Sequence, residues 1–128
     1  MKMGYLIDSN IWISAASTKS PAREILTKAL KSEWAGYSSI SRLEVLADPS
    51  ISEEEKQALK EMMALFVEVP VDHKIIDKAI HVSQSTKIKY TDAIAAATAI
   101  NMQAILVSRN IEDFSTVPAL LVINPFLE

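Results

Sequence analysis

Two kinds of hydrophobic pattern alternate along the chain. Short apolar runs bounded by glycine, proline or polar residues predict buried strands. These runs cover residues 4–8, 37–39, 66–69, 104–107 and 120–123. Between them lie segments in which apolar residues recur every three or four positions, which predicts amphipathic helices. The helices are expected over 11–16, from 21 to about 34, from 39 or 41 to about 47, from 52 to about 66, over 72–82 and over 93–102.

Capping residues support these boundaries. Ser52 and Asp72 are suited to the N-cap of the fourth and fifth helices, and either Thr91 or Asp92 is suited to the N-cap of the sixth. Strands separated by helices over the whole chain predict an α/β fold with three layers, in which a mostly parallel sheet of about five strands is flanked by helices. We expect residues 1–128 to form a single domain, because neither a linker nor a repeat interrupts the pattern.

Four acidic residues far apart in the sequence are expected at one edge of this sheet. Asp8 ends the first predicted strand, and Asp113 follows the fourth. Glu44 falls on the apolar stripe of its helix, and Asp92 stands at the head of an alanine-rich helix that can lie close to the sheet. Binding sites of parallel sheets lie past the carboxyl ends of the strands, and clustered carboxylates repel each other unless a cation neutralises them. The alternative is that each acid is a helix cap or a solvated surface residue.

Composition narrows the class of protein. The net charge of −3 and the pI of about 5.4 argue mildly against a protein that coats nucleic acid, but they leave room for a nuclease with local bases beside an acidic pocket. The chain has no cysteine, which excludes disulfides and zinc–thiolate sites. It has no apolar run of membrane-spanning length and no signal-peptide pattern in its first ten residues, so we expect a cytoplasmic protein with no membrane partner.

Three segments resemble the PIN-domain family. LIDSNIWI at 6–13 is similar to the family's LLDTNVLI-type opening, and SISRLEVLA at 39–47 is similar to its serine- and glutamate-containing helix. TDAIAAATAINMQAILVSRNIEDF at 91–114, with VINP shortly after it, resembles the family's most recognisable stretch. The order and spacing fit over essentially the whole chain. By size and layout, the chain resembles the VapC-type toxin ribonucleases of toxin–antitoxin pairs.

The resemblance implies a metal-dependent endoribonuclease with a PIN-like fold. Asp8, Glu44 and Asp92 match the metal-binding, catalytic acids of the family, and Asp113 is the candidate for the fourth. Asn110 takes the place directly after Arg109 where relatives carry an acid, so either residue could complete the site, which leaves one or two metal ions possible. Mg²⁺ or Mn²⁺ suits a set of oxygen ligands. The hydrolysis would leave a 5′-phosphate and a 3′-hydroxyl.

Supporting residues and partners complete the expectation. Ser9 and Asn10 would orient the first aspartate, and Arg42, Lys89 and Arg109 are candidate contacts to RNA phosphates. The resemblance also implies a homodimer and an antitoxin protein, whose peptide we place near Trp12, Trp34 and the fourth helix. Two other functions stay open: a housekeeping RNA-processing nuclease, and a non-catalytic PIN-like interaction module.

Overall fold

The strands form one parallel sheet. The computed structural model describes residues 4–126. The strand order is β3-β2-β1-β4-β5, and each neighbouring pair is parallel. The strands are β1 (Gly4–Ile7), β2 (Ala35–Ser38), β3 (Val67–Val69), β4 (Ala104–Val107) and β5 (Val122–Ile123). All five correspond to predicted strands, and the pairing of β1 with β4 puts the end of the first strand beside the end of the fourth.

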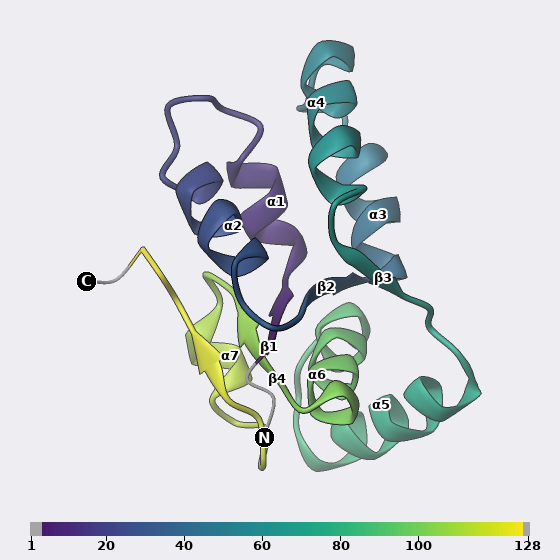
Figure 1. Cartoon of the computed structure of the whole chain (residues 1–128). Coiled ribbons are helices and arrows are strands. Elements are labelled where there is room, and N and C mark those ends of the chain that lie inside the picture. Colours follow the sequence, from purple (N-terminus) through teal and green to yellow (C-terminus); the bar gives the residue numbers. More distant parts are fainter. Residues whose placement is uncertain (1–3, 127–128) are drawn as a thin grey trace.

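Helices cover both faces of the sheet, which confirms the three layers (Figure 1). They are α1 (Ser9–Ser14), α2 (Ala22–Leu30), α3 (Ser39–Leu46), α4 (Glu53–Met63), α5 (His73–Ser85), α6 (Tyr90–Met102) and α7 (Ile111–Phe114). One apolar core lies between the sheet and the first four helices, and the other lies between the sheet and the last three. Neighbouring residues of β1 and β4 alternate between them: Ile7 and Val107 enter the first core, and Leu6 and Leu106 enter the second.

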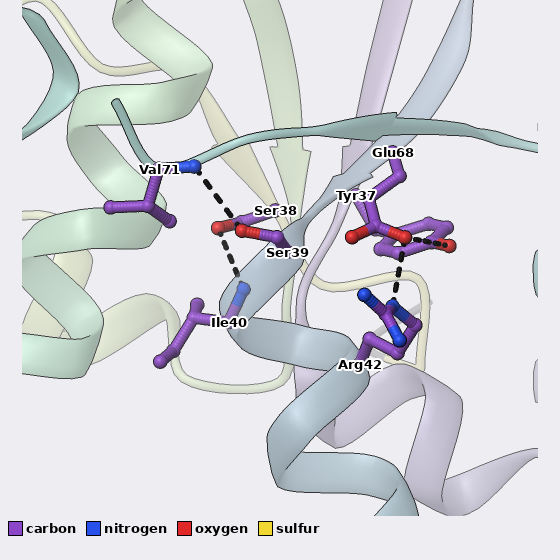
Figure 2. Close-up of polar contacts among 7 residues, drawn as sticks. All are labelled: Tyr37, Ser38, Ser39, Ile40, Arg42, Glu68 and Val71. Atoms are coloured by element: carbon purple, nitrogen blue, oxygen red, sulfur yellow. Dashed lines mark hydrogen bonds and ion pairs between the residues drawn. The ribbon is translucent and has the colours of Figure 1, made fainter. Parts of the chain in front are cut away.

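Several helix starts follow from local capping. Ser52 and Glu55 form a reciprocal capping box at the start of α4, and the Asp72 carboxylate accepts a hydrogen bond from the backbone N–H of Ile75 in α5. α3 begins at Ser39, and its N-cap is Ser38, the last residue of β2, rather than Ser39 or Ser41: the Ser38 hydroxyl accepts from the backbone N–H of Ile40 (Figure 2). Ser39 instead accepts from the backbone N–H of Val71 at 3.2 Å, which ties α3 to the segment after β3.

The predicted cap of α6 is wrong. The helix begins at Tyr90, and Lys89 occupies the N-cap position without a side-chain hydrogen bond to the helix. Asp92 therefore lies in the first helical turn, where a negative charge is favoured by the helix dipole. Its carboxylate is consequently not used as a cap and is available at the sheet edge. Asp8, in contrast, does cap α1, by accepting from the backbone N–H of Ser9.

The tryptophan expected at a docking surface lies in the core. Trp12 is fully buried, and its ring makes edge-on contacts with Tyr37 and Phe66, at centroid separations of 5.8 Å and 4.9 Å. Leu59 and Met63 of α4 are also buried in this core. Trp12 therefore cannot contact an antitoxin peptide directly, and the expected position of that peptide near Trp34 and α4 stays a prediction. Within residues 4–126, every helix is too short or too polar to cross a lipid bilayer.

Gly36 is packed closely against the Trp34 side chain and the backbone of β3. A Cβ atom added at this residue would lie 2.6 Å from the Val67 carbonyl oxygen and 2.6 Å from the Trp34 ring. We expect Gly36→Ala to reduce the free energy of unfolding by about 1–3 kcal/mol, the usual cost of overpacking. Urea unfolding of the variant and the wild type measures this difference. A change below about 0.5 kcal/mol, typical of a tolerant surface position, would contradict the close packing described.

Candidate functional site

Asp8 lies at the centre of the sheet edge, between the ends of β1 and β4. Its backbone N–H donates to the Val107 carbonyl oxygen at 2.9 Å, which extends the β1–β4 pairing by one residue. Its Oδ1 accepts from the Ser9 backbone N–H at 2.9 Å. Its Oδ2 accepts from the Ser108 hydroxyl at 2.8 Å and from Asn10 Nδ2 at 3.3 Å. Three residues thus donate hydrogen bonds to the Asp8 carboxylate. Two of them, Ser9 and Asn10, are the residues expected to orient it.

The surroundings of Asp8 oppose its negative charge. The pKa of Asp8 is raised from its ordinary value of 3.8 to about 6, mainly by burial and also by the charges of Asp92 and Glu44, against the lowering by hydrogen bonds from Ser108 and Ser9. Only 8% of the residue is exposed. Two other predicted acids are therefore close enough to act on this carboxylate, although the three lie on different elements. A bound cation would stabilise the ionised form.

Glu44 approaches the site from α3. It is half-buried, and its Oε1 lies 2.6 Å from the Ser9 hydroxyl, which in turn lies 2.8 Å from the Ser41 hydroxyl. A carboxylate only accepts hydrogen bonds, so Ser9 donates to Glu44 and accepts from Ser41. Ser9 thereby touches Glu44 through its side chain and Asp8 through its backbone N–H. The prediction that Glu44 faces inward from its helix is confirmed.

The side-chain amide of Asn110 lies within hydrogen-bonding distance of both Asp92 and Asp113. Asn110 Nδ2 lies 3.4 Å from Asp92 Oδ2 and 3.1 Å from Asp113 Oδ2. Burial raises the pKa of the half-buried Asp92, the nearby charge of Lys89 lowers it, and the charges of Asp113 and Glu44 raise it again. Asp113 is exposed in the first turn of α7, a short helix that the hydrophobic pattern did not predict. Asn110 therefore contacts both acids, and whether it or Asp113 completes the site stays open.

Ser108 and Ser41 were missed by the sequence argument. Ser108 is fully buried directly after β4, and Ser41 is buried in the first turns of α3. The available signal for Ser108 was its position, because it follows β4 as Asp8 follows β1. A small hydroxyl residue after a buried strand, opposite an aspartate in the predicted pairing, could have been included on that ground.

The donor chemistry fits a hard cation. Asp8, Asp92 and Glu44 offer carboxylate oxygens only, and the pKa of Asp8 is raised first by burial and then by the nearby charges of Asp92 and Glu44. Within residues 4–126, no three acidic or histidine side chains converge closely enough to hold an ion jointly. Mg²⁺ commonly binds through one or two carboxylates and keeps several waters, so joint contact by three groups is not required. The assignment of Asp8 and Asp92 as direct ligands stays a prediction.

The three predicted basic residues differ in their contacts and in their distance from the acids. Arg109 lies beside the site: its backbone N–H donates to Asn10 Oδ1 at 3.1 Å, its Nη1 donates to Ser14 at 3.0 Å, and its guanidinium lies 4.5 Å from the centre of the Phe126 ring. Lys89 is exposed at the start of α6 and acts on the charge of Asp92. Lys89 is therefore close to Asp92, whereas Arg109 is tied to the site through its backbone and its guanidinium lies against Ser14 and Phe126.

Arg42 points elsewhere. Figure 2 shows its guanidinium beside Glu68 of β3, to which Nε donates at 2.9 Å, while the Tyr37 hydroxyl donates to the same oxygen at 3.1 Å. Because this ion pair is largely exposed, it is weak and can open. The contacts of Arg42 and Arg109 with a substrate both stay predictions.

Comparisons with known proteins agree on the fold. The PIN domain matches residues 5–120 of the chain. The structure is similar to a toxin–antitoxin complex from Klebsiella pneumoniae, with a TM-score of 0.80 and 26% identity over 95% of this chain and 98% of that one. It is also similar to VapBC2 from Rickettsia felis bound to a promoter DNA fragment, with a TM-score of 0.81 and 23% identity over 95% of this chain and 98% of that one. No curated protein matches the chain by sequence.

Proposed function

This chain belongs to the PIN-domain family, and from that premise we propose that it is a Mg²⁺- or Mn²⁺-dependent endoribonuclease, the toxin of a toxin–antitoxin pair. PIN domains are nucleases, and the fold here is that of the family. The observation that carries the proposal is the buried Asp8 carboxylate, held by hydrogen bonds on both oxygens and repelled by Asp92 and Glu44. A fold gains nothing from crowding these acids unless a cation binds among them.

Different residues would bind the metal ion, orient its ligands and bind the RNA phosphates. Asp8 and Asp92 would hold the ion, with Glu44 and Asp113 beside them, and Ser9, Asn10 and Asn110 keep the carboxylates in place through hydrogen bonds. The ion, when bound, neutralises charge on the scissile phosphate and lowers the pKa of an attacking water. Arg109 and Lys89 would bind neighbouring phosphates. The Arg109 side chain is already held by Ser14 and Phe126, so less side-chain entropy is lost when a phosphate binds.

The toxin role is supported by the similar structures. They include a toxin–antitoxin complex that aligns with nearly the whole of this chain at 26% identity. We propose that this protein likewise has an antitoxin partner, acts in the cytoplasm and forms a homodimer. Co-expression with the product of an adjacent small gene, followed by purification through a tag on this chain, should recover a stable complex without RNA cleavage. Recovery of the chain alone in an active form would contradict the toxin role but not the nuclease.

Cleavage of RNA with Mn²⁺ is the direct test of the enzyme. We expect purified protein to cut single-stranded RNA in Mn²⁺ or Mg²⁺, to leave 5′-phosphate ends, and to stop when EDTA removes the ion. DNA of the same sequence serves as the control for substrate class. Undiminished cleavage in EDTA would contradict the metal-dependent chemistry, and preferential cleavage of the DNA would contradict the assignment of RNA as substrate.

A further inference from the structure

Ser108 is the most enclosed polar residue at the candidate site. None of its surface is exposed, and its hydroxyl has three polar neighbours. It donates to Asp8 Oδ2 at 2.8 Å, and it accepts from the Asn110 backbone N–H at 3.0 Å and from Asn10 Nδ2 at 3.2 Å. One hydroxyl group therefore connects the aspartate after β1, the loop after β4 and the first turn of α1.

The backbone around Ser108 is fixed independently of its side chain. Its own N–H donates to the Ile123 carbonyl oxygen at 3.0 Å, which extends the pairing of β4 with β5. On the other side, Ile7 pairs with Val107, and the Asp8 N–H donates to the Val107 carbonyl oxygen. The serine and the aspartate are thus carried by two paired central strands, which set the distance between their side chains.

The two oxygens of Asp8 are held unequally without this serine. Oδ1 has the short bond from the Ser9 backbone N–H. Oδ2 has only the hydrogen bonds from Ser108 at 2.8 Å and from Asn10 at the longer distance of 3.3 Å. Loss of the Ser108 hydroxyl would leave Oδ2 with the weaker partner alone, so the carboxylate could turn about its Cβ–Cγ bond. It would also remove the side-chain acceptor of the Asn110 N–H, at the start of the loop that reaches Asp92 and Asp113.

We propose that Ser108 is a positioning residue that holds Asp8 in the orientation needed to bind the divalent cation, an inference that rests on the proposed function. Ser108 does not itself contact the ion or the RNA. It acts through Asp8. By accepting from the Asn110 backbone N–H, it also fixes the loop that contacts Asp92 and Asp113 relative to Asp8. Groups that orient metal ligands in this way typically change metal affinity or activity by roughly 10–100-fold when they are removed.

A purely structural role would give a different result. A buried hydroxyl that only satisfies neighbouring polar groups contributes to the free energy of unfolding and leaves the affinity for metal unchanged. Thr98 provides a matched control, because it is also buried and its hydroxyl donates at 2.7 Å to the Ile94 carbonyl oxygen within α6, without touching an acid. Thr98→Val removes a buried hydroxyl at constant shape.

The experiment compares wild type, Ser108→Ala, Ser108→Thr, Ser108→Val and Thr98→Val. Mn²⁺ affinity is measured by calorimetry, thermal midpoints are measured in EDTA, and RNA cleavage is measured over a range of Mn²⁺ concentrations. We expect Ser108→Ala and Ser108→Val to weaken Mn²⁺ binding roughly 10–100-fold, with a matching rise in the Mn²⁺ concentration for half-maximal cleavage and little change in KM for RNA. Ser108→Thr should restore binding to within a few-fold, and Thr98→Val should bind as the wild type does.

The outcomes separate this inference from the proposed function. If wild type binds Mn²⁺ and cuts RNA, but Ser108→Ala binds Mn²⁺ equally well, the positioning role is wrong and the proposed function stands. Thr and Val have the same shape, so equal Mn²⁺ affinity of Ser108→Thr and Ser108→Val would overturn the role even where the alanine variant fails to fold. If wild type itself binds no Mn²⁺, the proposed function fails and this inference fails with it.

Discussion

Asp8→Asn should abolish metal-dependent cleavage of RNA while the protein stays folded. The amide keeps the shape of the carboxylate, and its oxygen can still accept from the Ser9 backbone N–H. It removes the negative charge that a divalent cation needs at the most buried acid of the site. Because loss of an outer partner already costs roughly 10–100-fold, loss of a direct ligand should reduce the cleavage rate by more than about 100-fold.

A charge-matched control separates the site from the overall charge. Asp77 is exposed in the second turn of α5 beside His73, outside the group of predicted acids, and Asp77→Asn changes the net charge by the same amount. Initial rates of RNA cleavage in saturating Mn²⁺ should be near those of wild type for Asp77→Asn. Asp92→Asn should behave like Asp8→Asn. Cleavage by Asp8→Asn at the wild-type rate would show that the reaction takes place elsewhere.

The same substitution should make the metal-free protein more stable at neutral pH. The pKa of Asp8 is about 6 in the folded protein and 3.8 in its ordinary state. Between these values the folded chain keeps a proton that the unfolded chain has lost, so the free energy of unfolding falls as the pH rises through this window. The total loss above pH 6 is about 3 kcal/mol, from the 1.36 kcal/mol that each pKa unit represents. Asparagine cannot ionise and should escape this loss.

Urea unfolding in EDTA at several pH values measures this effect. Near pH 4 wild type and Asp8→Asn should differ little, and by pH 7 the variant should be more stable by up to about 3 kcal/mol. Acids remote from Asp8 titrate equally in both proteins, so the difference between the two curves reports Asp8 together with its electrostatic coupling to Asp92 and Glu44. Parallel curves would mean that Asp8 is ionised in the folded chain without cost. Saturating Mn²⁺ should narrow the gap at pH 7, since it binds wild type alone.

The sheet and the position of Asp8 beside the segment after β4 followed from the sequence because both depend on simple periodicity. Short apolar runs identified all five strands, and the rule that sites lie past parallel strand ends placed Asp8 near the segment after β4. Glu44 was identified because a charged residue on the apolar stripe of a helix is unfavourable unless it has a polar partner or a ligand. These inferences rest on patterns several residues long, so an error of one position did not change them.

Helix caps and the positions of single side chains were harder to predict, because the sequence often allows two alternatives. Thr91 and Asp92 are both good caps, yet α6 starts earlier, at Tyr90, and leaves Asp92 in the first turn. α7 has only four residues, too few to show helical periodicity, so the setting of Asp113 could not be foreseen. Trp12 could not be placed from the sequence either, because an amphipathic ring suits both a core and a surface site.

Hydrogen-bond partners from distant segments were beyond the sequence argument. Ser108 contacts Asp8 across 100 positions, and Ser41 contacts Ser9 across 32. Serine has no pattern of its own, so its role depends on strand register and helix position that only the folded chain fixes. The pairing of Arg42 with Glu68 is of the same kind, since it depends on the contact between α3 and β3.

Calorimetric titration of wild type and Asp8→Asn with Mn²⁺ tests the central claim most directly. The account predicts saturable binding to wild type, and binding that is lost or at least about 100-fold weaker in Asp8→Asn, although the variant is folded. Equal binding to both would show that the ion is held away from Asp8. No binding to wild type would mean that the crowded acids serve another purpose, and a non-catalytic interaction module would then be the better description of the protein.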